Sequence, residues 1–201
     1  MIILKNSGVK SLEGLEYAEN VIDFYLEGSE DIKDFSTLEK LHKIEQVDIR
    51  TKSLNDDTVP VLDSHPNLKS LAYQDSLITE KSFEKIIKSS TIKSMQLNSN
   101  PNIKSFGVLT QMSNLEYLMM QFTGVSDFRP VNDFAKLETI FAHGQKTVDT
   151  PIELKLSDLI WNEVKIETAK RYLNGEGSLK SLVRSFFCSS FNCSRIGTGI
   201  L

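Results

Sequence analysis

The sequence has little cysteine, no long apolar run and no excess of positive charge. Its two cysteines, Cys188 and Cys193, lie close to the C-terminal end, so a disulfide framework is excluded for the rest of the chain. No segment approaches the roughly 18 consecutive apolar residues of a membrane span, so membrane insertion is not expected. The formal net charge is −4, whereas nucleic-acid binders usually carry a basic field, so nucleic acid is not an expected partner.

The remaining composition is that of a mildly acidic globular chain. It has 201 residues, of which 40% are hydrophobic and 25% are charged, which suits one domain, or one domain and part of a second. The apolar run in Met1–Asn6 is three residues long, and a secretory signal needs about 7–15. The chain is therefore expected to stay in the cytoplasm if Met1 is its authentic start.

One template, apolar-x-x-apolar-x-apolar, recurs along the chain. The intervals between the first positions of successive segments are 23, 24, 24, 23 and 22 residues, and a fixed period of this length indicates a repeat architecture. Six segments fit the template: Val21-Phe24-Leu26, Ile44-Val47-Ile49, Leu68-Leu71-Tyr73, Ile92-Met95-Leu97, Leu115-Leu118-Met120 and Leu137-Ile140-Ala142.

Apolar residues between these segments follow a second pattern. In four gaps the period is three, as in Ile32-Phe35-Leu38-Leu41, which predicts 3₁₀ turns. The gap from Thr79 to Lys88 predicts a short α-helix capped by Thr79. The gap from Asn55 to His65 predicts a shorter helix, limited by Pro60, with Asp57 as a candidate N-cap.

Each unit is thus a short strand followed by a 3₁₀ or helical segment. A single unit cannot bury its apolar face, whereas stacked units form a continuous core. The predicted fold class is an α/β solenoid, with a parallel sheet on the concave face and 3₁₀ or short helical segments on the convex face.

The strand template and its period resemble the leucine-rich repeat family, and within it the bacterial internalin-like proteins. Their repeat is matched by Ile32-Lys33-Asp34-Phe35-Ser36-Thr37-Leu38 and Val125-Ser126-Asp127-Phe128, and Val9–Asn20 looks like a first full repeat. The likeness covers residues 2–145. It implies a leucine-rich repeat fold, a non-enzymatic binding function, and secretion or display on the cell surface.

The sequence departs from the family at the position three residues after the last strand leucine, where the family carries asparagine. Here only Asn100 keeps the pattern, and Ser and Thr substitute for it in part. Lys52 does not, so we expect local irregularity near Lys52. The six residues are Ser29, Lys52, Ser76, Asn100, Thr123 and Gln145.

The domain organisation follows from the extent of the repeat. Residues 1–145 are the solenoid, with six full strand repeats and an N-terminal partial one in which Ile3 and Asn6 match Leu97 and Asn100. Residues 146–180 resemble the start of an immunoglobulin-like module. Residues 181–201 are an atypical tail, interpreted either as a loosely packed terminus or as an out-of-frame or fused end. Because Met1 then falls inside a strand, the chain is expected to be an N-terminally truncated fragment, with residues 2–4 as its outermost strand.

Residues capable of catalysis or metal binding lack the spacing that these functions need. His42, His65 and His143 fall in different repeats with no partner at ligand spacing, and they are expected to be surface or turn residues. Cys188 and Cys193 do not form a C-x-x-C pair. No catalytic residue, cofactor or metal site is predicted.

The candidate site lies on the predicted concave face. The third, fifth and seventh template positions project onto it, and they become aromatic and apolar in the last two repeats. The predicted partner is a protein or peptide, held by Tyr117, Met119 and Phe141 with Phe122 and His143 beside them. Two alternatives remain open: a gene fragment without a function, and an intracellular leucine-rich scaffold or regulator.

Overall fold

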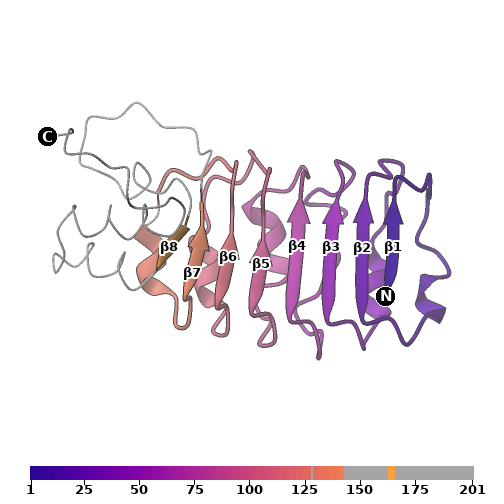
Figure 1. Ribbon diagram of the computed structural model, residues 1–201, viewed down its shortest axis with the longest axis horizontal. Coiled ribbons are helices and arrows are strands. Elements are labelled where there is room, and N and C mark those ends of the chain that lie inside the picture. Colours follow the sequence, from indigo (N-terminus) through magenta and orange to yellow (C-terminus); the bar gives the residue numbers. More distant parts are fainter. Residues whose placement is uncertain (128, 143–162, 166–201) are drawn as a thin grey trace, which may run out of the picture.

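The computed structural model describes residues 1–127, 129–142 and 163–165. These residues form one sheet of eight strands whose order in space follows their order in the chain (Figure 1). The first seven strands pair in parallel, and β8 pairs antiparallel with β7. The strands are β1 (Ile2–Lys5), β2 (Asp23–Glu27), β3 (Gln46–Arg50), β4 (Ser70–Gln74), β5 (Ser94–Gln96), β6 (Tyr117–Met119), β7 (Thr139–Phe141) and β8 (Glu163–Lys165).

The repeat alignment is confirmed by the register of the sheet. The fourth template residues pair directly with one another from β2 to β7, in the row Phe24, Val47, Leu71, Met95, Leu118 and Ile140. All six are buried, so they form one column of a continuous core, as stacking of identical units requires. The predicted solenoid with a parallel sheet is therefore confirmed.

Short 3₁₀ helices cover the other side of the core, behind the sheet in Figure 1. Their period of three puts every third side chain on the buried face. The helices are η1 (Leu15–Tyr17), η2 (Ser36–Lys40), η3 (Glu80–Lys85), η4 (Gly107–Gln111) and η5 (Arg129–Asp133).

The α-helix predicted for Thr79–Lys88 is wrong, because η3 is a 3₁₀ helix. Phe83 and Ile86, which are three residues apart, are the fully buried pair, and Ile87 is only partly buried. The amide of Ile87 does bond the carbonyl of Phe83 at 2.9 Å, so a single α-type turn closes the segment. The predicted cap is confirmed, since Oγ1 of Thr79 accepts from the backbone amide of Lys81.

The helix predicted between Asn55 and His65 is absent, and Asp57 caps nothing there. Asn55 supplies the local acceptor, because its Oδ1 takes the amides of Asp57 at 2.9 Å and Thr58 at 3.2 Å. This closes a turn, and Pro60, which lacks an amide hydrogen, prevents its extension into a helix.

The first strand is shifted by one residue from the prediction. Leu4, not Ile3, pairs with Leu26, and Asn6 follows the strand at the position of Ser99, not of Asn100. Ile3 is 55% exposed, and Ile2 and Leu4 pack on the core. The prediction used the six-residue interval of Leu97–Ile103. The interval from Leu4 to Val9 is five residues, as in Ile49–Leu54, Tyr73–Ile78 and Met120–Val125, and a one-residue shift reverses the face of every side chain.

The family's asparagine position lies inside the turn that follows each strand. Asn100 is buried there, whereas Lys52 is exposed and its buried neighbours Thr51 and Ser53 bond each other through their hydroxyls at 3.0 Å. Thr51 also lacks the left-handed backbone found at equivalent turn residues such as Asp75 and Ser99. The irregularity expected near Lys52 therefore takes the form of a different turn.

The predicted boundaries 1–145, 146–180 and 181–201 fall mostly outside the described residues. Within the second range the structure describes β8, whose antiparallel pairing with β7 ends the run of parallel strands. The immunoglobulin-like module and the atypical tail remain predictions.

Candidate partner-binding face

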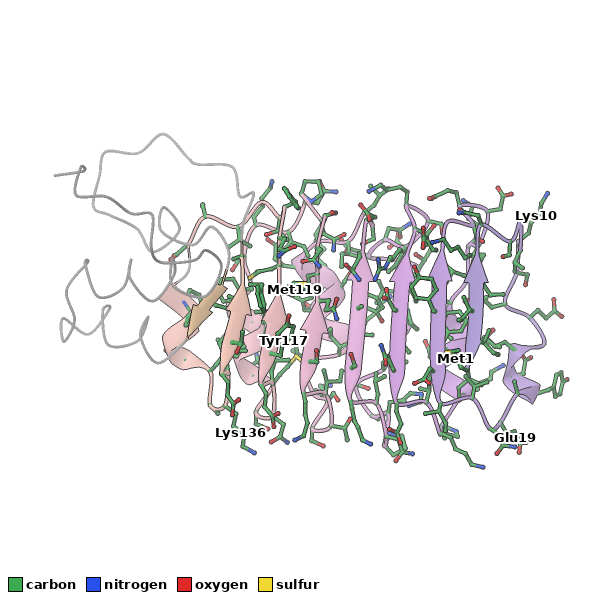
Figure 2. All side chains as sticks on the ribbon, in the orientation of Figure 1. Met1, Lys10, Glu19, Tyr117, Met119 and Lys136 are labelled. Carbon is green, nitrogen blue, oxygen red and sulfur yellow. The ribbon has the colours of Figure 1, made fainter. Side chains whose placement is uncertain are left out.

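The concave face is the side of the sheet opposite the 3₁₀ helices. Side chains alternate between the two faces of a strand, so the residues between the buried template positions point onto this face. Tyr117 and Met119 lie on it as alternate residues of β6 (Figure 2). The strands position these side chains through backbone pairing, which gives the face a fixed spacing.

A chain of hydrogen bonds crosses the middle of the concave face. The backbone amide of Gln121 donates to Oδ1 of Asn98 at 2.9 Å, and Nδ2 of Asn98 donates to Oε1 of Gln74 at 3.0 Å. Nε2 of Gln74 donates to Oδ1 of Asp48 at 3.4 Å. We call these four residues the polar ladder. Its donors all point toward the N-terminal repeats, so it ends on a carboxylate that accepts.

Four charged residues on the concave face of the N-terminal repeats form two ion pairs, Lys5–Glu27 and Arg50–Asp48. Arg50 makes two bonds to Asp48, from Nε at 3.1 Å and from Nη2 at 2.8 Å, and its guanidinium lies 5.4 Å from the ring centre of Tyr25. The hydroxyl of Tyr25 donates to Glu27, which also pairs with Lys5 at 3.1 Å.

These contacts shift three pKa values. The hydrogen bond to Glu27, with burial, raises the pKa of Tyr25, and the same bond lowers the pKa of Glu27. The hydrogen bond to Asp48 raises the pKa of Arg50. All three shifts favour the protonation states that the pairs need at neutral pH, so the charges of Lys5, Glu27, Asp48 and Arg50 are compensated within the chain.

The other end of the face carries the predicted apolar residues. The rings of Tyr117 and Phe141 are in tilted contact, with centroids 5.5 Å apart and an interplanar angle of 52°. Met119 pairs with Phe141 in the register, and all three side chains are partly exposed. We call Tyr117, Met119 and Phe141 the aromatic patch. Residues from two neighbouring strands thus form one contiguous surface.

The two remaining predicted site residues have different outcomes. Phe122 lies in the turn after β6, not on the strand, and is 52% exposed with a left-handed backbone, φ 55°. His143 lies outside the described residues. That any of the five residues binds a partner remains a prediction.

Two polar arrangements were missed by the sequence analysis. One is the polar ladder, whose only signal is the presence of amide and carboxylate residues at the fifth and seventh positions of successive repeats. The other is on the convex side, where Asp56 accepts from the amide and Oγ1 of Thr79, at 2.8 and 2.6 Å, and from Oγ of Ser82. Burial raises the pKa of Asp56, but the hydrogen bonds from Ser82 and Thr79 outweigh this and leave it lowered. Asp56 therefore joins two repeats as a carboxylate.

The histidines are not equivalent. His42 is exposed, as expected. Of the surface or turn position expected for His65, only the turn holds, because its side chain is 5% exposed and its amide bonds the carbonyl oxygen of Leu62 at 3.3 Å. Nε2 of His65 lies 3.3 Å from the carbonyl oxygen of Leu38, and its Nδ1 has no hydrogen-bond partner among the described residues. Burial lowers the pKa of His65, against the hydrogen bond to Leu38 and the charge of Glu39, which raise it.

This burial predicts a loss of stability in mild acid. The unfolded chain binds a proton at His65 near the ordinary pKa of about 6.5, and the folded chain binds it less readily. The stability contribution is therefore complete above about pH 6.5 and is lost as the pH falls through and below that value. We expect a lower urea midpoint at pH 5.5 than at pH 7.5, and a flatter dependence in His65→Gln. An equal pH dependence in the variant would contradict this.

The described residues include no group of three or more His, Cys, Asp or Glu side chains arranged to hold a metal ion. Among the same residues, no helix has the length and apolar character of a membrane span. The described face offers ring and thioether surface at one end and paired polar groups at the other.

Comparison with known proteins finds similar solved structures but no similar sequence family. No protein-family model and no curated protein sequence matches the chain. Among solved structures, internalin C2 of Listeria monocytogenes is similar, with 26% sequence identity, a TM-score of 0.59 and coverage of 72% of this chain. The chain spans 62% of the length of that structure. Internalin F of the same species matches at 17% identity over 71% of this chain and 47% of its own, with a TM-score of 0.44.

The parallel register, the 3₁₀ segments and the similarity to internalin C2 define the class of fold. The molecule is a leucine-rich repeat solenoid. Within that class it is internalin-like, as the repeat of 22–24 residues and the resemblance of its first repeats indicated.

Proposed function

We propose that the chain is a non-enzymatic protein-binding module of a bacterial surface or secreted leucine-rich repeat protein. It recognises a protein or peptide on its concave face through Tyr117, Met119 and Phe141, with Phe122 and His143 beside them. The observation that carries the proposal is the contact between Tyr117 and Phe141 on a face that leaves both rings partly exposed. The internalin-like fold suggests a protein-interaction module, and solenoids use such faces for extended partners.

The polar ladder supports the same function in a different way. Its side chains form hydrogen bonds with one another and with the backbone. They are therefore already ordered beside the aromatic patch before a ligand binds. A preorganised surface loses less conformational entropy on binding. The affinity is therefore expected to come mainly from the patch, since partly exposed aromatic clusters are common interface anchors.

The double variant Met119→Ala, Phe141→Ala tests the proposal. Truncating anchors of this kind costs about 2 kcal/mol or more, or about 30-fold in affinity. We expect the immobilised variant to lose the proteins that the wild type captures from cell-surface extracts, as measured by quantitative mass spectrometry. Its melting temperature should stay within about 4 °C of the wild type, because the patch lies outside the core.

A matched control is Ser94→Ala, Gln96→Ala, which changes two concave residues of β5 and leaves the patch intact. It should capture like the wild type. Equal capture by the patch variant would overturn the proposed site. A large fall in its melting temperature would show that the patch belongs to the core, and capture by neither wild type nor control would favour the alternative of a fragment without a function.

A further inference from the structure

One position in the turn after a parallel strand takes a left-handed backbone in five repeats. Four of these residues are small or polar, and their amides bond the neighbouring repeat, for example Gly28 to the carbonyl of Arg50 at 2.9 Å and Ser99 to that of Gln121 at 2.8 Å. The conformation is thus imposed by the stacking of repeats. The five are Asn6 (φ 45°), Gly28 (φ 75°), Asp75 (φ 48°), Ser99 (φ 59°) and Phe122 (φ 55°).

Phe122 is the exception in this series. Glycine adopts this conformation without a steric cost, and asparagine and aspartate tolerate it through local hydrogen bonds, whereas a bulky side chain there is a genuine outlier. Phe122 is also 52% exposed, so a strained backbone and an exposed aromatic ring coincide at one residue. Strain of this kind concentrates at binding and catalytic sites, where it belongs to the mechanism.

The surroundings of Phe122 indicate what it would bind. It lies three residues after the end of β6, which carries Tyr117 and Met119. Glu163 and Lys165 of β8 pair with Phe141 and Thr139 at the edge of the sheet, whereas the concave positions of β5 to β7 hold no charged residue. These positions are Ser94, Gln96, Asn98, Tyr117, Met119, Gln121, Thr139 and Phe141. The charged side chains Lys5, Glu27, Asp48 and Arg50 lie in the N-terminal repeats, in the pairs Lys5–Glu27 and Arg50–Asp48.

We propose that Phe122 is a binding anchor that extends the aromatic patch at a cost in stability, and that its partner is an apolar stretch of polypeptide. The inference rests on the proposed function and names the chemistry of the partner.

The stability half of the proposal is tested by Phe122→Asn. Asparagine relieves the strain, so the melting temperature should rise by about 2–4 °C. Phe122→Tyr keeps both the ring and the strain and should melt like the wild type. Ser99→Asn makes a related change at the same position of the preceding repeat and controls for the asparagine itself. A lower melting temperature in Phe122→Asn would overturn the proposal, because it would show a residue that stabilises the fold.

The binding half uses random linear peptides displayed on phage and selected on the wild-type protein. The selected peptides should share an apolar or aromatic segment. Phe122→Asn should weaken their binding by about 30-fold, whereas Phe122→Tyr and Ser99→Asn preserve it. Peptides without an apolar segment in common, or no enrichment beyond a selection on Phe122→Asn, would overturn the inference.

The same peptides separate this inference from the proposed function. If Phe122→Asn binds them normally and Met119→Ala, Phe141→Ala does not, the patch is the site and Phe122 is not an anchor. If neither variant changes their binding, the concave site itself is wrong.

Discussion

Replacing Asn100 by alanine is expected to lower the free energy of unfolding by about 3–5 kcal/mol. Asn100 is fully buried, and its Nδ2 donates to the carbonyl oxygens of Tyr73 at 2.7 Å and Leu97 at 2.9 Å. Its Oδ1 accepts from the amide and the hydroxyl of Ser76, at 2.9 and 2.7 Å. Alanine leaves these four groups without partners, and each buried unsatisfied group costs about 1–3 kcal/mol before relaxation.

Alanine variants at the same position of two other repeats give reference values for the loss of unfolding free energy in Asn100→Ala. Oγ1 of Thr123 donates to the carbonyl oxygen of Met120 at 3.2 Å, a longer bond than those of Asn100, so Thr123→Ala should cost about 1 kcal/mol. Oγ of Ser29 has no partner among the described residues, so Ser29→Ala should be nearly neutral. Urea denaturation monitored by circular dichroism measures all three. Equal losses would contradict the role of Asn100 as a bridge between repeats.

The second large effect is expected at Met120. This side chain is fully buried, so Met120→Ala should cost about 2–5 kcal/mol through lost burial and the cavity that remains. Met119 is the adjacent residue but points onto the concave face, so Met119→Ala should cost less than about 1 kcal/mol. The pair compares the same substitution on the two sides of one strand.

The same denaturation experiment measures this difference. A cost at Met119 equal to that at Met120 would mean that the aromatic patch is packed as core, and the proposed site would then be lost. A small cost at Met120 would mean that the strand register is wrong.

The repeat spacing predicted most of this fold, because burial of one apolar face requires the template residues to align. Phe24, Val47 and Leu71 pair in the predicted row. The contact between Tyr117 and Phe141 follows from the same alignment, since adjacent parallel strands lie about 4.8 Å apart.

Strand register and helix type were less predictable where the sequence fits two different residue spacings. Leu4–Val9 fits an interval of five, yet the prediction took the interval of six found at Leu97–Ile103, and the face of β1 was reversed. The gap from Thr79 to Lys88 suggested an α-helix, although its fully buried pair, Phe83 and Ile86, has the three-residue spacing of a 3₁₀ helix.

The polar contacts could not be predicted from spacing at all. Asp48 and Gln74 are neighbours only after the strands are stacked, and a change of side-chain rotamer would break their bond. Asp56 appeared to belong to a helix start, and its partners Thr79 and Ser82 lie in the next repeat. Such contacts depend on side-chain conformation, which the strand register alone does not determine.

Methionine oxidation tests most directly whether the aromatic patch is open on the leucine-rich repeat sheet. The exposed and the buried methionines of the same chain serve as controls for Met119. Met1 is exposed, Met95, Met112 and Met120 are buried, and Met119 lies on the concave face beside Phe141. Dilute hydrogen peroxide converts accessible methionine to its sulfoxide, and tandem mass spectrometry resolves neighbouring sites. We predict that Met1 and Met119 oxidise while Met95, Met112 and Met120 stay protected in the folded protein. Protection of Met119 to the level of Met120, or oxidation of both together, would contradict an open aromatic patch on a leucine-rich repeat sheet.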